Sequence, residues 1–209
     1  MNVFVRGIAA SVLLFSLIAA GGCASKPARF YTLNPLIATE TPVKNVSDEG
    51  SFITVVGPVT IPGYLDRPQI VARSGQNEIR LSEYDRWAGP LESDISRVLV
   101  ENLSALLVND HATVLRWEPS VQALLPVKYR VSVELTRFEG APGGSVLLKA
   151  QWSILSQDRR LLLTRESGIS EPVNGNSYDA LVAAMSKALE RLSRDIAGAV
   201  TTLSRQAGQ

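Results

Sequence analysis

Cysteine and histidine are almost absent from this chain, and their scarcity limits the chemistry that it can perform. The 209 residues contain a single cysteine, Cys23, and a single histidine, His111. One cysteine cannot form an intramolecular disulfide, and one cysteine with one histidine falls short of the four ligands of a usual zinc site. We therefore expect a domain that is stabilised by its apolar core, with no metal and no other cofactor.

Catalytic motifs are lacking as well. His111 lies in an Asn-Asp-His sequence after an expected helix, and the chain has no Gly-x-Ser-x-Gly elbow to present a serine nucleophile to it. Gly140, Gly143 and Gly144 have the wrong spacing for a phosphate-binding loop and are typical of a turn between strands. We therefore expect that the protein is not an enzyme, and we interpret His111 as a surface turn residue.

Charge of one sign is not in excess. The chain has 21 basic and 20 acidic residues, and removal of residues 1–22 takes away only Arg6, which leaves the two charges balanced. Because no polybasic patch is evident, we do not expect nucleic-acid binding. No second long apolar run follows the N-terminal one, so the N-terminus is the only membrane attachment that the sequence indicates.

The N-terminal residues are typical of a secretory signal peptide. Arg6 provides a positive charge, residues 7–20 are apolar or small, and small residues lead up to Cys23. The apolar stretch is shorter than the roughly 20 residues that span a membrane. A cysteine directly after small residues indicates a lipobox. We predict that a signal peptide at 1–22 is removed and that Cys23 is then acylated, with palmitate among the acyl groups.

Two neighbouring positions bear on this lipobox. Ala20 stands where leucine is usual, so an ordinary secretory signal with a chance cysteine remains the alternative. Ala24 replaces the aspartate that usually retains Gram-negative lipoproteins in the inner membrane. We therefore predict that several acyl chains, which together make a stable anchor, hold the protein in the outer membrane with its body on the periplasmic face.

The rest of the sequence predicts a single domain of strands and helices. A lipid-anchored N-terminal segment at 23–51, with a short strand at 29–33 and then a flexible loop, precedes one α/β domain at 52–209. Apolar composition and turn residues predict strands at 52–61, with a bend at Gly57-Pro58, at 69–73, at 78–82 and at 112–117.

Hydrophobic periodicity identifies the remaining elements. Alternation across 127–138 and 146–154, with a third strand at 161–170, predicts an antiparallel meander that has one wet face. One amphipathic helix is expected to start at Gly89-Pro90, and a second is expected from Ser177 to about Arg205. We expect the apolar stripe of the second helix to cover the meander, and a coiled-coil seam is the alternative.

One stretch carries a resemblance to a known family. GPVTIPGYLDRPQIVAR at 57–73, followed by NEIRLSEYDRWAGPLESDISRVLVENLSALL at 77–107, resembles the ABC-type transport auxiliary lipoproteins, the PqiC-like family. The upstream RFYTL and the last helix fit as well, so the resemblance covers nearly all of the mature chain. It implies an α/β fold, a mixed sheet with an antiparallel meander flanked by helices, similar to the N-terminal domain of TolB.

The resemblance also implies a function. Such proteins are periplasm-facing lipoproteins that act with ABC transporters whose partner subunits carry MCE domains and move phospholipid or other hydrophobic molecules. Tyr64, Asp66, Arg67 and Trp87 match the family motif and form either a docking surface for the MCE-domain partner or a structural unit. In the structural interpretation, which we favour, Asp66 pairs with Arg67, Pro68 fixes the strand entry and Trp87 packs over the first helix.

Two other functions compete with a role as transport accessory subunit. A scaffold lipoprotein would hold envelope proteins without taking part in transport, whereas a carrier would bind lipid in an apolar cavity. The regular alternation predicts a filled core, which disfavours the carrier. The sequence leaves open the transported molecule, the partner surface and the oligomeric state, a homo-oligomer included.

Overall fold

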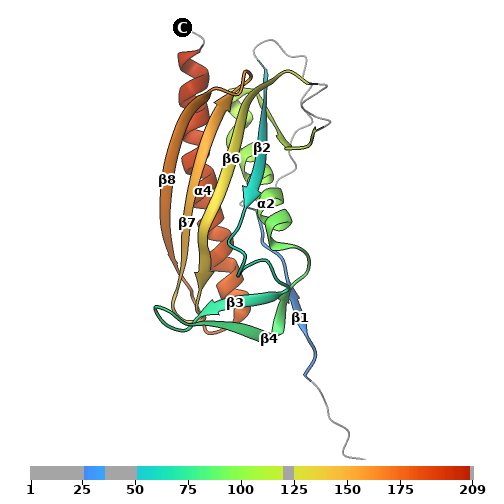
Figure 1. Ribbon diagram of the computed structural model, residues 1–209, viewed down its shortest axis with the longest axis vertical. Helices are drawn as coiled ribbons and strands as arrows, with labels where there is room; N and C mark the ends of the chain where they lie inside the picture. Colours follow the sequence, from blue (N-terminus) through green and yellow to red (C-terminus); the bar gives the residue numbers. More distant parts are fainter. Residues whose placement is uncertain (1–25, 36–50, 120–124, 208–209) are drawn as a thin grey trace, which may run out of the picture.

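In the part of the chain that the structure describes, one mixed sheet of eight strands forms the body, and helices α2 and α4 lie on one of its faces (Figure 1). The computed structural model describes residues 26–35, 51–119 and 125–207. Its elements are β1 (Arg29–Tyr31), β2 (Phe52–Thr60), β3 (Gln69–Arg73), β4 (Ile79–Trp87), α2 (Leu91–Leu106), the short 3₁₀ helix η1 (Val108–Asp110), β5 (Ala112–Arg116), β6 (Val127–Gly140), β7 (Ser145–Ser156), β8 (Leu161–Pro172) and α4 (Tyr178–Gln206).

Strand β6 is the centre of the sheet. It pairs in parallel with β2 along one edge and antiparallel with β7 along the other, while β5 and β8 lie outside β2 and β7. Beyond the end of β2, the same edge of β6 meets β3 through one parallel pair, Ala72 with Gly140. Strands β3, β4 and β1 therefore form a subsheet, which crosses one end of the large sheet in Figure 1.

The long helix α4 covers the meander of β6, β7 and β8, as its apolar stripe predicted, and it also packs against α2 (Figure 1). Ser177 caps its first turn by accepting a hydrogen bond from the amide of Ala180 at 3.1 Å, which satisfies one of the free amides at a helix start. Trp152 of β7 is 1% exposed beneath the helices. Its indole nitrogen donates to Ser167 at 3.1 Å, and Ser167 donates to Asp195 of α4.

The opposite face of the sheet is mostly polar, but it carries a second, smaller apolar cluster. Ile53, Val55 and Val127 are buried there, and Leu115 and Trp117 pack against them. Trp117 lies so close to β2 that a side chain on Gly57 would meet its Cβ atom at 2.7 Å. Glycine is therefore required at this position, which also has a φ of 132°.

The structure specifies one expectation about the strands and corrects another. At the expected bend, Gly57-Pro58, the pairing of β2 with β6 has a register irregularity between Val56 and Val59, and β2 continues through it to Thr60. Strand β4 runs to Trp87 instead of ending near residue 82, because its last residues pair in parallel with β1. Such pairing between distant segments leaves no local sequence pattern.

A buried carboxylate fixes β1 to the sheet. Asp85 of β4 is 4% exposed and accepts hydrogen bonds at 2.8 Å from Arg29, Tyr31 and Ser82. Burial alone would raise the pKa of Asp85, but the hydrogen bonds from Arg29, Ser82 and Tyr31 bring it below its ordinary value. Residues 29–31 are thus joined to the sheet, whereas residues 36–50 of the expected loop lie outside the described residues.

Candidate partner-docking site

Residues 61–68 of the family motif form the turn between β2 and β3, which we call the motif turn. Inside it the amide of Leu65 donates to the carbonyl of Pro62, and the amide of Arg67 donates to the carbonyl of Leu65, each at 2.8 Å. The amide of Trp87 donates to the carbonyl of Pro68 at 2.7 Å, which joins the turn to the end of β4. The turn is therefore held where the subsheet meets the start of α2.

Glu139 of β6 holds this turn in place, a role that no sequence pattern indicated. Its carboxylate is 1% exposed and accepts a hydrogen bond from the Tyr64 hydroxyl. The guanidinium of Arg73 donates to the same carboxylate from Nε at 2.9 Å and from Nη2 at 2.8 Å, and Arg137 Nε donates at 3.0 Å. One buried negative charge thus links the turn, β3 and β6.

The pKa values of Glu139 and Tyr64 reflect this contact. Burial alone would raise the pKa of Glu139, but the hydrogen bonds from Tyr64, Arg137 and Arg73 hold it below its ordinary value. Burial, together with the hydrogen bond to the carboxylate, raises the pKa of Tyr64 to about 12. Glu139 is therefore ionised and Tyr64 is a neutral donor at neutral pH.

The four motif residues separate into two pairs. Trp87 is 5% exposed and belongs to the main core, and the hydroxyl of Tyr64 is bound inside the protein, so both have structural roles. Asp66 is exposed and Arg67 is half-buried. The ion pair that the structural interpretation expected between them is not among the interactions of the described residues, and Arg67 Nε is buried there without a hydrogen-bond partner.

The chain that follows β1 is clamped to the helices beside this turn. The amide of Leu33 donates to Asp94 of α2 at 2.7 Å, and Arg97 donates to the carbonyl of Leu33 at 2.7 Å. The amide of Asn34 donates to Ser186 of α4 at 3.0 Å. Leu33 and Asn34 thereby join the chain after β1 to both α2 and α4.

His111 is placed as the sequence indicated. It is exposed, follows η1 with a φ of 56°, and its carbonyl accepts a hydrogen bond from the Phe52 amide at 3.2 Å. Within the described ranges, no group of three or more His, Cys, Asp or Glu residues is arranged to hold a metal ion. No helix in those ranges is long and apolar enough to cross a membrane. Cys23 and Ala24 lie outside the described residues.

We predict that Tyr64→Phe lowers the free energy of unfolding by about 1.5–3 kcal/mol at neutral pH, because it removes a hydrogen bond to a charged group. The depressed pKa of Glu139 adds stability above the pKa that this group has in the unfolded chain, and that stability is lost as the pH falls through the folded value. The difference between native and variant should therefore shrink in acid.

Denaturant unfolding of the full chain across a pH series measures this effect. Tyr84→Phe is the matched control, since Tyr84 lies on the same subsheet outside the Glu139 cluster. The prediction is wrong if the loss in free energy of unfolding caused by Tyr64→Phe stays constant from neutral pH down to a pH at which carboxyl groups are protonated.

Comparisons with known proteins agree with this architecture. A family model described as "ABC-type transport auxiliary lipoprotein component" matches residues 31–197. The intermembrane transport lipoprotein PqiC of Escherichia coli K12 is 24% identical over 184 residues, which cover 87% of this chain and 92% of that protein. The PqiC of Shigella flexneri matches equally. Both relatives are named as intermembrane transport lipoproteins.

Solved structures share the fold. A crystal structure of an uncharacterized protein aligns with a TM-score of 0.68 at 20% identity, covering 84% of this chain and 99% of the other. The protein XCC0632 of Xanthomonas campestris aligns with a TM-score of 0.65 at 17% identity, covering 87% and 99%. The expected α/β fold is confirmed, and the match over residues 31–197 shows that this chain belongs to the family of ABC-type transport auxiliary lipoprotein components.

Proposed function

We propose that the protein is the accessory subunit of an MCE-type ABC transport system that moves lipids or other hydrophobic molecules across the envelope and supports its integrity. The match to the family over residues 31–197, from β1 into α4, carries this proposal. The match extends over most of the described fold, and the curated relatives are named for intermembrane transport.

The protein's own part in transport is passive in this proposal. The sequence offers no phosphate-binding loop that would hold ATP, so the energy comes from an ATPase elsewhere in the system. The face of the sheet under the helices is filled by large side chains such as Trp152 and Phe138, which are 1% and 0% exposed. That packing favours a subunit that holds one end of a conduit over a carrier with lipid in its core.

The tether fits this arrangement. Cys23 precedes Arg29 by six residues in the sequence, and Arg29 begins β1, which lies at one end of the molecule (Figure 1). Acylated at Cys23 and sorted through Ala24, the protein would be anchored in the outer membrane with the subsheet nearest the lipid. Its motif turn is then presented beside the anchor.

Asp66 and Arg67 are the residues of the motif that can reach a partner. They lie on a turn that is held by Glu139 and β4, so a partner meets a preformed surface and little ordering cost is added on binding. Arg67 suits such a contact because arginine is enriched at interface hot spots and the residue is only half-buried. We propose that this surface contacts the MCE-domain protein over about 1,200–2,000 Å².

If Cys23 is the acylated residue, Cys23→Ser should abolish lipid attachment. Metabolic labelling with a tagged palmitate should mark the native protein and leave the variant unlabelled as an unprocessed precursor. Label retained by Cys23→Ser would show that Cys23 is not the acylated residue.

Sorting predicts that Ala24→Asp moves the protein from the outer to the inner membrane, because it restores the residue that usually retains Gram-negative lipoproteins there. Density-gradient fractionation of the two membranes, with immunodetection, measures the shift. A native protein found wholly in the inner-membrane fraction would overturn the sorting argument.

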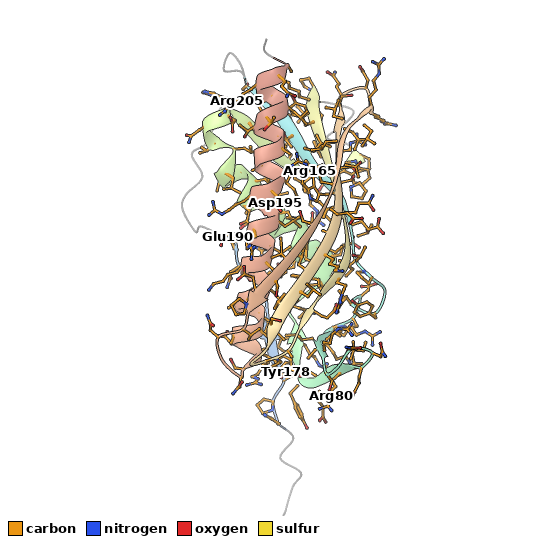
Figure 2. All side chains as sticks on the ribbon, turned by 90° about the vertical axis from the view of Figure 1, so that its left-hand side faces the viewer. Arg80, Arg165, Tyr178, Glu190, Asp195 and Arg205 are labelled. Carbon is orange, nitrogen blue, oxygen red and sulfur yellow. The ribbon has the colours of Figure 1, made fainter. Side chains whose placement is uncertain are left out.

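If the motif turn is the docking surface, Arg67→Ala and Asp66→Ala should reduce recovery of the MCE-domain protein after crosslinking and co-purification, by about thirtyfold for Arg67→Ala if it is a hot spot worth about 2 kcal/mol. Arg165→Ala, an exposed arginine on β8 (Figure 2), is the control and should have no effect. Unchanged thermal unfolding must accompany the loss.

Two results would count against the proposal, one against the docking surface and the other against the transport function itself. If both motif variants recover the partner at native levels, the contact lies on another surface. If the native protein never associates with an MCE-domain protein, the transport assignment fails and a scaffold lipoprotein takes its place.

A further inference from the structure

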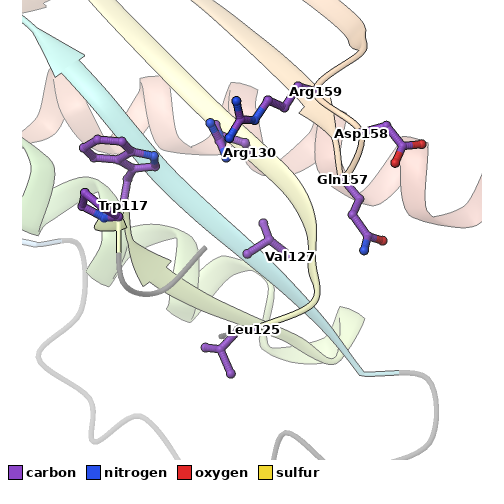
Figure 3. Close-up of a pocket in the computed structure, with 8 residues that line it drawn as sticks. Trp117, Leu125, Val127, Arg130, Gln157, Asp158 and Arg159 are labelled. Atoms are coloured by element: carbon purple, nitrogen blue, oxygen red, sulfur yellow. The ribbon is translucent and has the colours of Figure 1, made fainter. Parts of the chain in front are cut away.

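A pocket of about 660 Å³ opens on the sheet face away from the helices, at the end of the molecule remote from β1. Its walls come from Trp117, which follows β5, from Val127 and Arg130 on β6, and from Asp158 and Arg159 in the turn between β7 and β8 (Figure 3). Neither the motif turn nor the Glu139 cluster contributes to it. The pocket is therefore separate from the candidate docking surface.

Two arginines face one another in this pocket. Figure 3 shows the guanidinium groups of Arg130 and Arg159 side by side, while the carboxylate of Asp158 points away from both. Burial, and then the charge of Arg159, lower the pKa of Arg130. No ion pair within the described ranges involves either arginine, and residues 120–124 (Ser, Val, Gln, Ala, Leu) include no acidic side chain. Two adjacent positive charges thus have no ion-pair partner among the residues that the structure describes.

Two hydrogen-bond donors in the same pocket also lack an acceptor in the described part of the chain. The indole Nε1 of Trp117 and the Nε of Arg130 are both buried, and neither has a hydrogen-bond partner in the described part of the chain. Buried donors in folded proteins are nearly always paired, and an unpaired one is costly. Donors and charges together favour a negatively charged acceptor between Trp117, Arg130 and Arg159.

The apolar residues that line the pocket indicate which kind of anion it can bind. Val127 and Trp117 belong to the small apolar cluster on this face, and Leu125 at the rim is 37% exposed. An apolar wall next to two guanidinium groups suits an anion that is attached to a carbon body. Arginine forks bind carboxylate and phosphate in pairs of parallel hydrogen bonds, but a phosphate has enough oxygens to engage two guanidinium groups and an indole at once.

We propose that this pocket binds the phosphate group of an organic phosphate, with Arg130, Arg159 and the Trp117 indole as donors and the carbon body against Val127 and Leu125. The same chemistry is offered by a phospholipid headgroup and by a small soluble phosphate ester. The inference rests on the pocket alone and does not depend on the proposed transport function.

The test is calorimetric titration of the full chain, purified in a non-ionic detergent that carries no phosphate. The probes are inorganic phosphate, glycerol 3-phosphate, short-chain dihexanoyl phosphatidylglycerol and, as the carboxylate comparison, acetate. We expect the organic phosphates to bind more tightly than acetate. Arg130→Gln and Arg159→Gln should each weaken that binding by at least about tenfold, because each removes a charge-assisted contact.

Arg165→Gln is the matched control, since it removes the same charge from an exposed position on β8 (Figure 2). Arg159 is exposed in a turn, so its variant should retain the fold, and thermal unfolding checks this for each protein. Tighter binding of the lipid than of glycerol 3-phosphate identifies a headgroup site. Equal or weaker binding of the lipid identifies a site for soluble phosphate esters.

Three results would overturn the inference. They are no binding of any phosphate probe, acetate binding as tightly as the phosphates, and equal weakening by Arg165→Gln and the pocket variants. Such a failure would leave recovery of the MCE-domain partner unchanged, so it is distinguishable from failure of the proposed function.

Discussion

The buried carboxylate of Glu139 is the interaction on which the arrangement of this protein depends. Strand β3 meets β6 through one backbone pair, Ala72 with Gly140, which is too little to fix a subsheet by backbone hydrogen bonds. Glu139 adds contacts to Tyr64, Arg73 and Arg137 at the same junction. Removing one partner of a buried charge typically costs about 3–5 kcal/mol, so the junction resists separation of the two parts of the sheet.

Periodic elements could be predicted from the sequence because their signal is local. The alternation of β6 and β7 and the apolar stripe of α4 each lie within one continuous segment, and the structure confirms all three. The pairing of β1 with β4 joins residues 56 positions apart, and neither segment alone indicates it.

The candidate site was harder to predict for a related reason. Trp87 belongs to a residue type that is common at hot spots, but residue type does not determine exposure, and the structure buries it. Glu139 lies just beyond the alternation expected at 127–138, whereas β6 continues to Gly140 and its end is buried after a register irregularity between Leu135 and Arg137. Tyr64 and Arg73 then meet Glu139 only because the turn folds back over β6.

The two faces of the sheet carry different chemistry. Under α2 and α4, side chains fill the space and provide most of the core. On the other face, the small cluster around Val127 interrupts a polar surface and leaves room beside two arginines. The fold thus separates stability from recognition: the helices close one face, and the strand ends and turns remain available on the other.

The length of α4 has a geometric consequence. Its 29 residues extend for about 43 Å at a rise of roughly 1.5 Å each, and the helix runs from the β1 end of the molecule to the opposite end (Figure 1). If the protein is tethered at Cys23 and stands with α4 upright on the bilayer, the arginine pair lies about a hydrocarbon-core thickness or more above the membrane that holds it. A headgroup still seated in that leaflet would then be out of its reach, so a lipid bound by the pair would already have left the membrane.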